Sequence, residues 1–162
     1  QVVKSVMSRA LTERVPWGGD GALPGPRNIQ WRRDADATLT WVEALDGGDS
    51  RVAAAKRDRL VLLGAPFTGA PTTLMETAWR AAGISWGHGT RAVVREDASR
   101  DRRTRAWLVD PTGPSAPRQL WERSSEDRYA DPGDFITTRD ARGQTVLFTS
   151  PDRKFAFLTG AG

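Results

Sequence analysis

Short runs in which apolar and polar residues alternate recur along most of this chain, and turn-forming residues separate them. Successive side chains of a β-strand point to opposite faces, so such runs predict strands. The expected strands lie near residues 28–33, 38–45, 59–63, 72–78, 82–87, 91–96, 104–109, 117–122, 134–139, 144–149 and 154–159. One run, TTLMETAWRAA, also fits a helix, but the strands expected on both sides of it favour a strand. The sequence therefore predicts an all-β fold.

The expected strands form a repeat, because Ile84-Ser85-Trp86 follows Ile29-Gln30-Trp31 at the equivalent place in the next group of strands. Four short strands recurring at a spacing of about 50 residues are typical of β-propeller blades. An immunoglobulin-like sandwich also has short strands, but it would not repeat a four-stranded block. The expected strands make up about three such groups, so the sequence predicts about three four-stranded antiparallel blades. A closed propeller has roughly 4 to 8 blades, so we expect these blades to form an incomplete ring.

This repeat predicts how the chain is divided. We expect the end of a preceding blade and a connection over 1–27, a blade over 28–79, a second blade over 80–123 and a partial blade over 124–162. A blade without a neighbour leaves one face uncovered. We therefore expect apolar side chains to be exposed near the C-terminal end, at Phe148, Phe155, Phe157 and Leu158. The tryptophans of the strands are expected to fill the contacts between sheets, namely Trp31, Trp41, Trp86 and Trp107.

A possible catalytic motif lies in the hairpin over 83–96, where residues 83–87 spell G-x-S-x-G and His88 follows. A nucleophile elbow needs a strand, a sharp turn at the serine and then a helix, with its histidine far downstream. Ser85 instead lies within an expected strand that leads to a Gly-rich turn and another strand. We interpret Ser85 as a strand residue and His88, the only histidine, as a turn residue.

Composition narrows the function further. The 162 residues are 38% hydrophobic and 27% charged, which indicates one globular domain without a membrane-spanning run. The net charge is +4, but basic and acidic residues are interspersed, so we expect neither a nucleic-acid surface nor a membrane surface. The chain has one histidine, no cysteine and no calcium-loop motif, so we expect no metal site and no cofactor. The sequence does not indicate a compartment.

Two charged segments are candidates for contact with a substrate or another domain. Residues 91–105 contain six arginines against three acids, and a guanidinium can pair with a glutamate side chain through two hydrogen bonds. The alternative is a solvated loop whose charges pair with each other. Residues 124–129 connect two repeat units, where they either hold the turn, with Tyr129 packed, or contact another domain. The candidate contact residues are Arg102, Arg103, Arg105, Glu126, Asp127 and Arg128.

Five segments, taken in order, resemble the N-terminal propeller of glutamyl endopeptidase-like serine peptidases of the prolyl oligopeptidase family. They are GPR leading to Trp31, LTWVEALDGGD at 39–49, APFTG at 65–69, AGISWG at 82–87 and RSSEDRY at 123–129. The turn at 140–143, DARG, is also similar to the turn of TolB-type propeller repeats. The resemblance covers nearly the whole chain.

The resemblance implies a propeller joined to a C-terminal α/β-hydrolase domain with a Ser-Asp-His triad. The propeller of that family covers the active site and limits access to peptides, and glutamyl members cleave after glutamate. The implied partners are a peptide substrate and the hydrolase domain of the same protein. That domain is not part of this sequence, so no catalytic residue is carried over and the chain itself is not assigned as an enzyme. The alternative is a non-enzymatic TolB-like or WD-repeat-like propeller that acts as a protein-interaction scaffold.

Overall fold

The computed structural model describes residues 2–8 and 19–160, and these residues form strands and turns but no helix. The strands are β1 (Pro26–Trp31), β2 (Thr38–Ala44), β3 (Asp58–Gly64), β4 (Thr72–Thr77), β5 (Arg80–Trp86), β6 (Ala92–Ala98), β7 (Arg103–Val109), β8 (Arg118–Ser124), β9 (Thr137–Arg139) and β10 (Thr145–Leu147). The prediction of an all-β chain is confirmed. The expectation for residues 9–18, within the connection over 1–27, lies outside the described residues.

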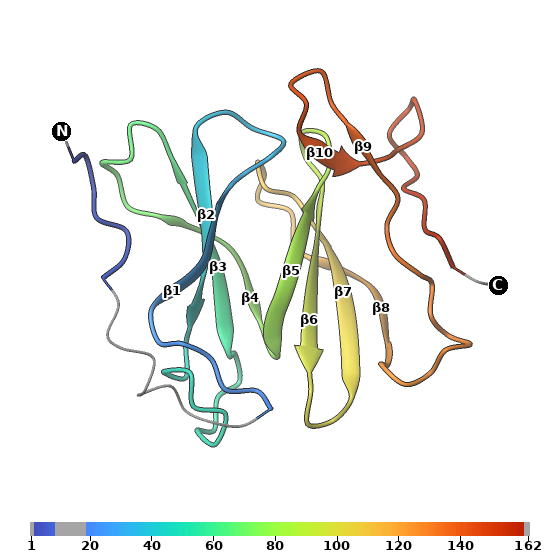
Figure 1. Ribbon diagram of the computed structural model, residues 1–162, viewed down its shortest axis with the longest axis horizontal. Helices are drawn as coiled ribbons and strands as arrows, with labels where there is room; N and C mark the ends of the chain where they lie inside the picture. Colours follow the sequence, from blue (N-terminus) through green and yellow to red (C-terminus); the bar gives the residue numbers. More distant parts are fainter. Residues whose placement is uncertain (1, 9–18, 161–162) are drawn as a thin grey trace.

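Two four-stranded antiparallel sheets make up most of the molecule, with strand orders β1-β2-β3-β4 and β5-β6-β7-β8. Each strand lies beside its neighbour in sequence, because antiparallel strands can be joined by tight turns. The hairpin that carries the G-x-S-x-G motif is confirmed, since Ile84 of β5 pairs with Val94 of β6. Figure 1 shows the two sheets side by side with β9 and β10 at one end. The described residues form no closed ring.

The main core fills the space between the two sheets. Val42 and Leu60 of the first sheet meet Trp86 and Val94 of the second in one cluster of buried side chains. The alternate residues of the same strands are also buried, because Trp41 packs in a separate cluster and Val93 packs against Leu147 of β10. Strands that are covered on both faces have nearly continuous apolar runs, such as LVLL in β3.

The third region is less regular. Strands β9 and β10 form a two-stranded sheet, and the strand expected over 154–159 was wrong. The backbone of that segment pairs with neighbouring residues at two isolated bridges, Thr149 with Ala156 and Phe135 with Leu158. The alternating pattern of KFAFLT therefore matches an extended segment whose backbone pairs only at points, without a continuous ladder.

Aromatic residues follow the prediction except at edges. Trp86 and Trp107 belong to the core between the sheets, and Trp41 packs on the other face of the first sheet. Trp31 is 57% exposed, so its expected burial was wrong. It lies on β1, an edge strand, where its ring meets Phe67 edge-on. Exposure at the C-terminal side is confirmed for Phe148, Phe155 and Phe157, while Leu158 is half-buried.

Candidate functional site

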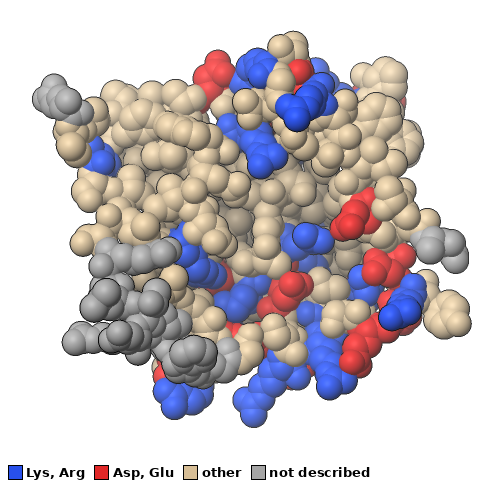
Figure 2. Space-filling model, in the orientation of Figure 1, with Lys and Arg blue, Asp and Glu red and all other residues tan. Residues whose placement is uncertain are grey.

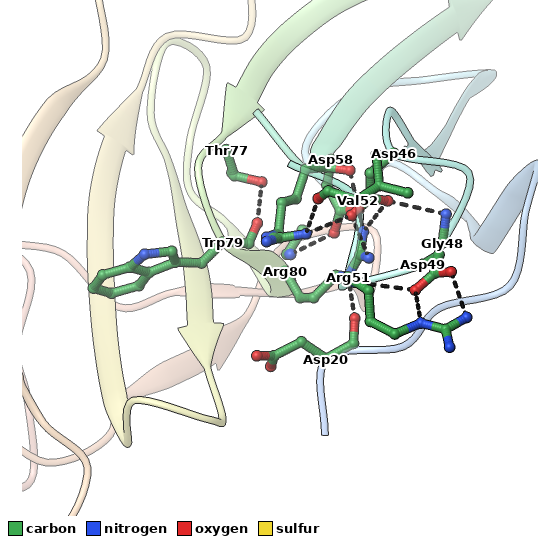
Figure 3. Close-up of polar contacts among 12 residues, drawn as sticks. Asp20, Asp46, Gly48, Asp49, Arg51, Val52, Asp58, Thr77, Trp79 and Arg80 are labelled. Carbon is green, nitrogen blue, oxygen red and sulfur yellow. Dashed lines mark hydrogen bonds and ion pairs between the residues drawn. The ribbon is translucent and has the colours of Figure 1, made fainter. Parts of the chain in front are cut away.

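Arginines and aspartates converge where the two sheets meet at one end. Asp58 opens β3, Arg80 opens β5 and Asp46 follows β2. The Arg80 guanidinium spans both carboxylates, with Nη2 2.7 Å from Asp46 Oδ2 and Nη1 3.0 Å from Asp58 Oδ1 (Figure 3). Both aspartate side chains are fully buried. One guanidinium at the start of the second sheet therefore bridges two carboxylates beside the first.

Further donors complete this cluster. The Arg57 Nη1 lies 2.8 Å from Asp46 Oδ2, and Arg27 pairs with Asp58. The backbone N–H of Ala81 donates to Asp58 Oδ2 at 2.7 Å. These contacts satisfy each carboxylate from several directions, which a buried charge requires if burial is not to destabilise the fold. We call Arg27, Asp46, Arg57, Asp58 and Arg80 the junction cluster.

A glycine shapes the loop that holds Asp46. The Gly48 N–H donates to Asp46 Oδ1 at 2.9 Å, and the Gly48 carbonyl accepts a hydrogen bond from the Ala22 N–H at 2.9 Å. Gly48 has a φ of 84°, and a Cβ added there would lie 2.0 Å from the Ala22 carbonyl oxygen. The left-handed backbone and the close approach of residue 22 both require glycine at this position.

The contacts within the junction cluster shift the pKa values of Asp46 and Arg80 in favour of their charged forms. Burial alone would raise the pKa of Asp46, but hydrogen bonds from Arg80, Arg57 and the Gly48 N–H hold that pKa below its usual value. Burial likewise works against the charged form of Arg80, yet its bonds to Asp46 and Asp58 raise its pKa. An aspartate held ionised in this way is not suited to act as a general acid near neutral pH.

A third buried acid, Glu96, organises the other sheet. Glu96 of β6 is fully buried and accepts hydrogen bonds from the Trp79 backbone N–H at 2.7 Å and from the Trp107 Nε1 at 2.6 Å. The Arg105 Nη1 lies 3.2 Å from Glu96 Oε1, and the Arg105 guanidinium stacks 3.8 Å from the centre of the Trp79 ring. Each of these polar groups therefore serves the packing of the sheet.

A cavity of about 860 Å³ lies beside the junction cluster. Its wall carries four arginines and three aspartates, together with Trp79 and two serines. The charged members are Asp20, Arg51, Arg57, Arg80, Asp97, Arg100 and Asp101. In Figure 2, Lys, Arg, Asp and Glu gather toward the two ends of the visible face, and the band between them is mostly uncharged. A cavity with charges of both signs suits a polar chain segment better than an apolar ligand.

None of the predicted contact residues lines this cavity, although Arg105 stacks on Trp79 of its wall. Arg102 Nη1 pairs with Glu126 Oε1 at 2.6 Å, and Arg103 pairs with Glu122. Arg105 is engaged with Glu96 and with Glu122 Oε2, which lies 2.6 Å from its Nε. These three arginines thus already have carboxylate partners within the chain. Their contact with a substrate or another domain stays a prediction.

Asp127 holds the turn over 124–129, one of the two roles considered for this segment. The Asp127 Oδ1 accepts hydrogen bonds from the backbone N–H groups of Tyr129 and Ala130, both at 3.0 Å. Arg128 is exposed, and its side chain makes no hydrogen bond or ion pair with the described residues. Tyr129 is fully exposed, so its expected packing was wrong. The hydrogen bonds of Asp127 shape this turn without any contribution from the tyrosine ring.

The G-x-S-x-G segment does not form a nucleophile elbow. Ser85 lies within β5, and the chain continues through a turn at His88 into β6 rather than into a helix. No hydrogen bond joins the Ser85 and His88 side chains, both of which are described. Among residues 2–8 and 19–160, no three His, Asp or Glu side chains are placed to hold a metal ion. The same residues contain no helix that could cross a membrane.

Sequence reasoning did not single out the junction cluster. Asp46, Arg57 and Asp58 sit in and beside a polar loop, where charged residues are usually solvated. The sequence feature that could have indicated these residues is the position of Asp58 and Arg80 at the first residues of buried strands. That signal does not reveal which strand ends meet, since the meeting depends on how two sheets pack.

The fold and this site together define a layered all-β region that has a polar cavity and lacks a catalytic constellation among its described residues. The whole chain is similar to two proteins named "Probable glutamyl endopeptidase, chloroplastic". The one from Oryza sativa subsp. japonica is 37% identical over 168 residues, which cover 100% of this chain and 18% of that protein. The one from Arabidopsis thaliana is 35% identical over 167 residues, which cover 99% of this chain and 17% of that protein.

The chain thus spans less than a fifth of the length of these curated relatives. No family model matches the chain, and no solved structure matches it. The similarity supports a peptidase-related region.

Proposed function

We propose that this chain is part of the β-propeller of a glutamyl endopeptidase-like serine peptidase of the prolyl oligopeptidase family. In this proposal the propeller caps the active site of a hydrolase domain in the same protein and restricts access to peptides, with cleavage after glutamate. The observation that carries the proposal is the match of the whole chain to relatives named glutamyl endopeptidase. The function proposed for the chain is therefore selection of substrates rather than catalysis.

The arrangement of the sheets supports the same proposal. Two sheets with the same strand order, β1-β2-β3-β4 and β5-β6-β7-β8, pack face to face, and a third region packs on the second sheet. Repetition of one four-stranded unit with buried contacts between neighbours is how propeller blades are built. The exposed phenylalanines of the third region are suited to contact a further blade.

The test uses the full-length protein that contains this region. We expect it to cleave a short peptide after glutamate, to leave the matching glutamine peptide uncut, and to react with a fluorophosphonate outside residues 1–162. We also expect it to cleave short peptides far faster than folded proteins that contain exposed glutamates. A variant with a weakened contact between the sheets, Leu60→Ala, should narrow that difference, because a loosened cap excludes large substrates less well.

Different outcomes separate the two parts of the proposal. A protein without any fluorophosphonate-reactive serine would contradict the peptidase assignment and favour an interaction scaffold. An active peptidase that cleaves folded proteins and short peptides equally well would contradict the capping role alone. Stoichiometric labelling of Ser85 would overturn the assignment of this region as non-catalytic.

A further inference from the structure

A second, smaller cavity lies at the β1 and β5 edges of the two large sheets and shares no lining residue with the junction cluster. Its volume is about 120 Å³, and residues of β1, β5, β9 and β10 line it together with Arg33, which follows β1. The polar side chains of its wall are Gln30, Arg33, Ser85, Thr137 and Thr145. Pockets for drug-sized ligands measure about 300–1,000 Å³, so this cavity suits a single small polar group.

The wall of this cavity offers hydrogen-bond donors and no carboxylate. A guanidinium, an amide and three hydroxyls can all donate, and the lining includes no Asp or Glu. Trp86 also lines the cavity, and its buried Nε1 has no acceptor in the described part of the chain. A wall of this composition favours an anionic ligand, because an anion accepts hydrogen bonds from every kind of group present.

The nearby acids are already matched by other arginines. Asp34 receives two hydrogen bonds from Arg32, at 2.7 and 2.9 Å. Asp36 lies 2.5 Å from Arg142 Nη1. Arg33 is exposed and has no carboxylate partner within residues 2–8 and 19–160. One positive charge at the cavity is therefore left for a ligand.

The edge of β5 adds backbone groups to this site. The Gly87 N–H donates to the Arg91 carbonyl oxygen at 2.8 Å, so Gly87 and Arg91 form a hydrogen-bonded pair. From this pair, hydrogen-bonded and non-hydrogen-bonded pairs alternate along β5 and β6. Ile84 and Trp86 then direct their N–H and C=O groups away from β6, because such pairs alternate along an antiparallel ladder. Strand β5 is an edge strand, so the backbone groups of half-buried Ile84 are open to an extended ligand, whereas Trp86 is only 2% exposed.

We propose that this cavity binds a carboxylate, held by Arg33 and the hydroxyls of Ser85, Thr137 and Thr145. The carboxylate belongs either to a small organic acid or to an acidic residue of an extended peptide, whose backbone the free edge of β5 can also pair with. This binding does not depend on the peptidase activity proposed above, since it involves no reacting group.

The experiment is calorimetric titration of the full-length protein, first treated with a fluorophosphonate so that no peptide is cleaved, with three probes: glutarate, a terminally blocked peptide with a central glutamate, and the same peptide with glutamine. The variants are Arg33→Gln and, as a matched control, Arg118→Gln, an exposed arginine at the start of β8. We expect Arg33→Gln to weaken binding of the glutamate peptide by about tenfold or more, because it removes a charged hydrogen-bond donor. Arg118→Gln should leave binding unchanged.

The probes distinguish the two sources of the carboxylate. If glutarate and the glutamate peptide bind equally, the ligand is recognised as a small acid; tighter binding of the peptide identifies a peptide residue. Binding to all three probes alike would overturn the proposal, and so would affinities that Arg33→Gln does not change. Thr145→Val, expected to weaken binding about threefold, tests the hydroxyl contribution without altering charge. An unchanged affinity in that variant would contradict the assigned role of Thr145.

Discussion

The two junctions of this molecule show what a charged pair is worth in each setting. Between the first and second sheets, Asp58 is fully buried, and Arg80 and Arg27 meet it there. Between the second sheet and the third region, Arg95 and Asp134 lie 3.6 Å apart with side chains 53% and 88% exposed. Opposite charges meet at both places, but only the charges of the first junction are buried from solvent. Burial, rather than the presence of a pair, decides how strongly each junction depends on its charges.

The apolar contacts differ in the same way. The first junction buries residues from both sheets, with Leu60 and Trp86 each 2% exposed. The second also has a buried centre, Leu147, but its surroundings include half-buried Trp121 and Phe135, whose rings stack 5.6 Å apart. Beyond this stack, Phe155 is 64% exposed. The third region is therefore held on one face only.

The largest expected effect is loss of the buried carboxylate at the first junction. Asp58→Ala would leave the largely buried Arg27 without its carboxylate and Arg80 with Asp46 alone, which costs about 3–5 kcal/mol. The measurement is hydrogen exchange with mass spectrometry on the full-length protein, read over β3 and β5. The matched control Asp134→Ala breaks the exposed pair and should cost less than about 1 kcal/mol. Equal losses from the two variants would contradict the contrast between the junctions.

The next effect concerns the apolar core. Leu60→Ala should destabilise β3 and β5 by about 2–5 kcal/mol, because it leaves a cavity between two rigid sheets. Leu147→Ala removes the same atoms at the second junction and should fall at the low end of that range, since the neighbouring loops can relax into the space. The same hydrogen-exchange experiment compares the two variants. A greater cost at Leu147 than at Leu60 would reverse the order of the two junctions.

A smaller effect is expected on acidification. The pKa of Asp46 is below its usual value in the folded chain, so ionised Asp46 stabilises the fold at any pH above the unfolded-state value of about 3.9. That contribution is lost as the pH falls through the lower, folded-state pKa. Thermal melting should therefore separate wild type from Asp46→Asn above about pH 4, and the separation should shrink in more acidic buffer. A difference in melting temperature that grows as the pH falls would contradict the stabilising role of ionised Asp46.

Much of the fold follows from local pattern, whereas the sites depend on long-range packing. Alternation and turn residues located β2 through β8 because each strand is decided within a few residues. The strand expected over 154–159 failed because a strand also needs a neighbouring ladder, and Lys154 to Thr159 have only point contacts. The expected packing of Tyr129 failed for a similar reason, since a sequence does not show whether a second surface covers a ring.

The junction cluster and the small cavity lay further beyond prediction. Asp46 and Arg80 are 34 residues apart, and only the packing of one sheet on another brings them together. Arg33, which follows β1, and Thr145 of β10 line one cavity although they are more than 100 residues apart in the sequence. Charged and hydroxyl residues are common at such positions, so their types alone give no signal until the sheets are placed.

The smallest effect on local stability, and the most informative about the third region, is expected from its exposed phenylalanines. Phe155→Ser removes a ring that is 64% exposed, so it should change stability by less than about 0.5 kcal/mol.

The same face, with Phe148 and Phe157 5.4 Å apart at their ring centres, should make the 162-residue chain self-associate when it is expressed alone. Size-exclusion chromatography should show aggregates of the 162-residue chain that decrease in Phe155→Ser, and a soluble full-length protein. The control Leu147→Ala removes a buried side chain and should not reduce aggregation. A monodisperse, cooperatively melting 162-residue monomer would show that the exposed rings need no partner, and the contrast between the two junctions would then not extend to association.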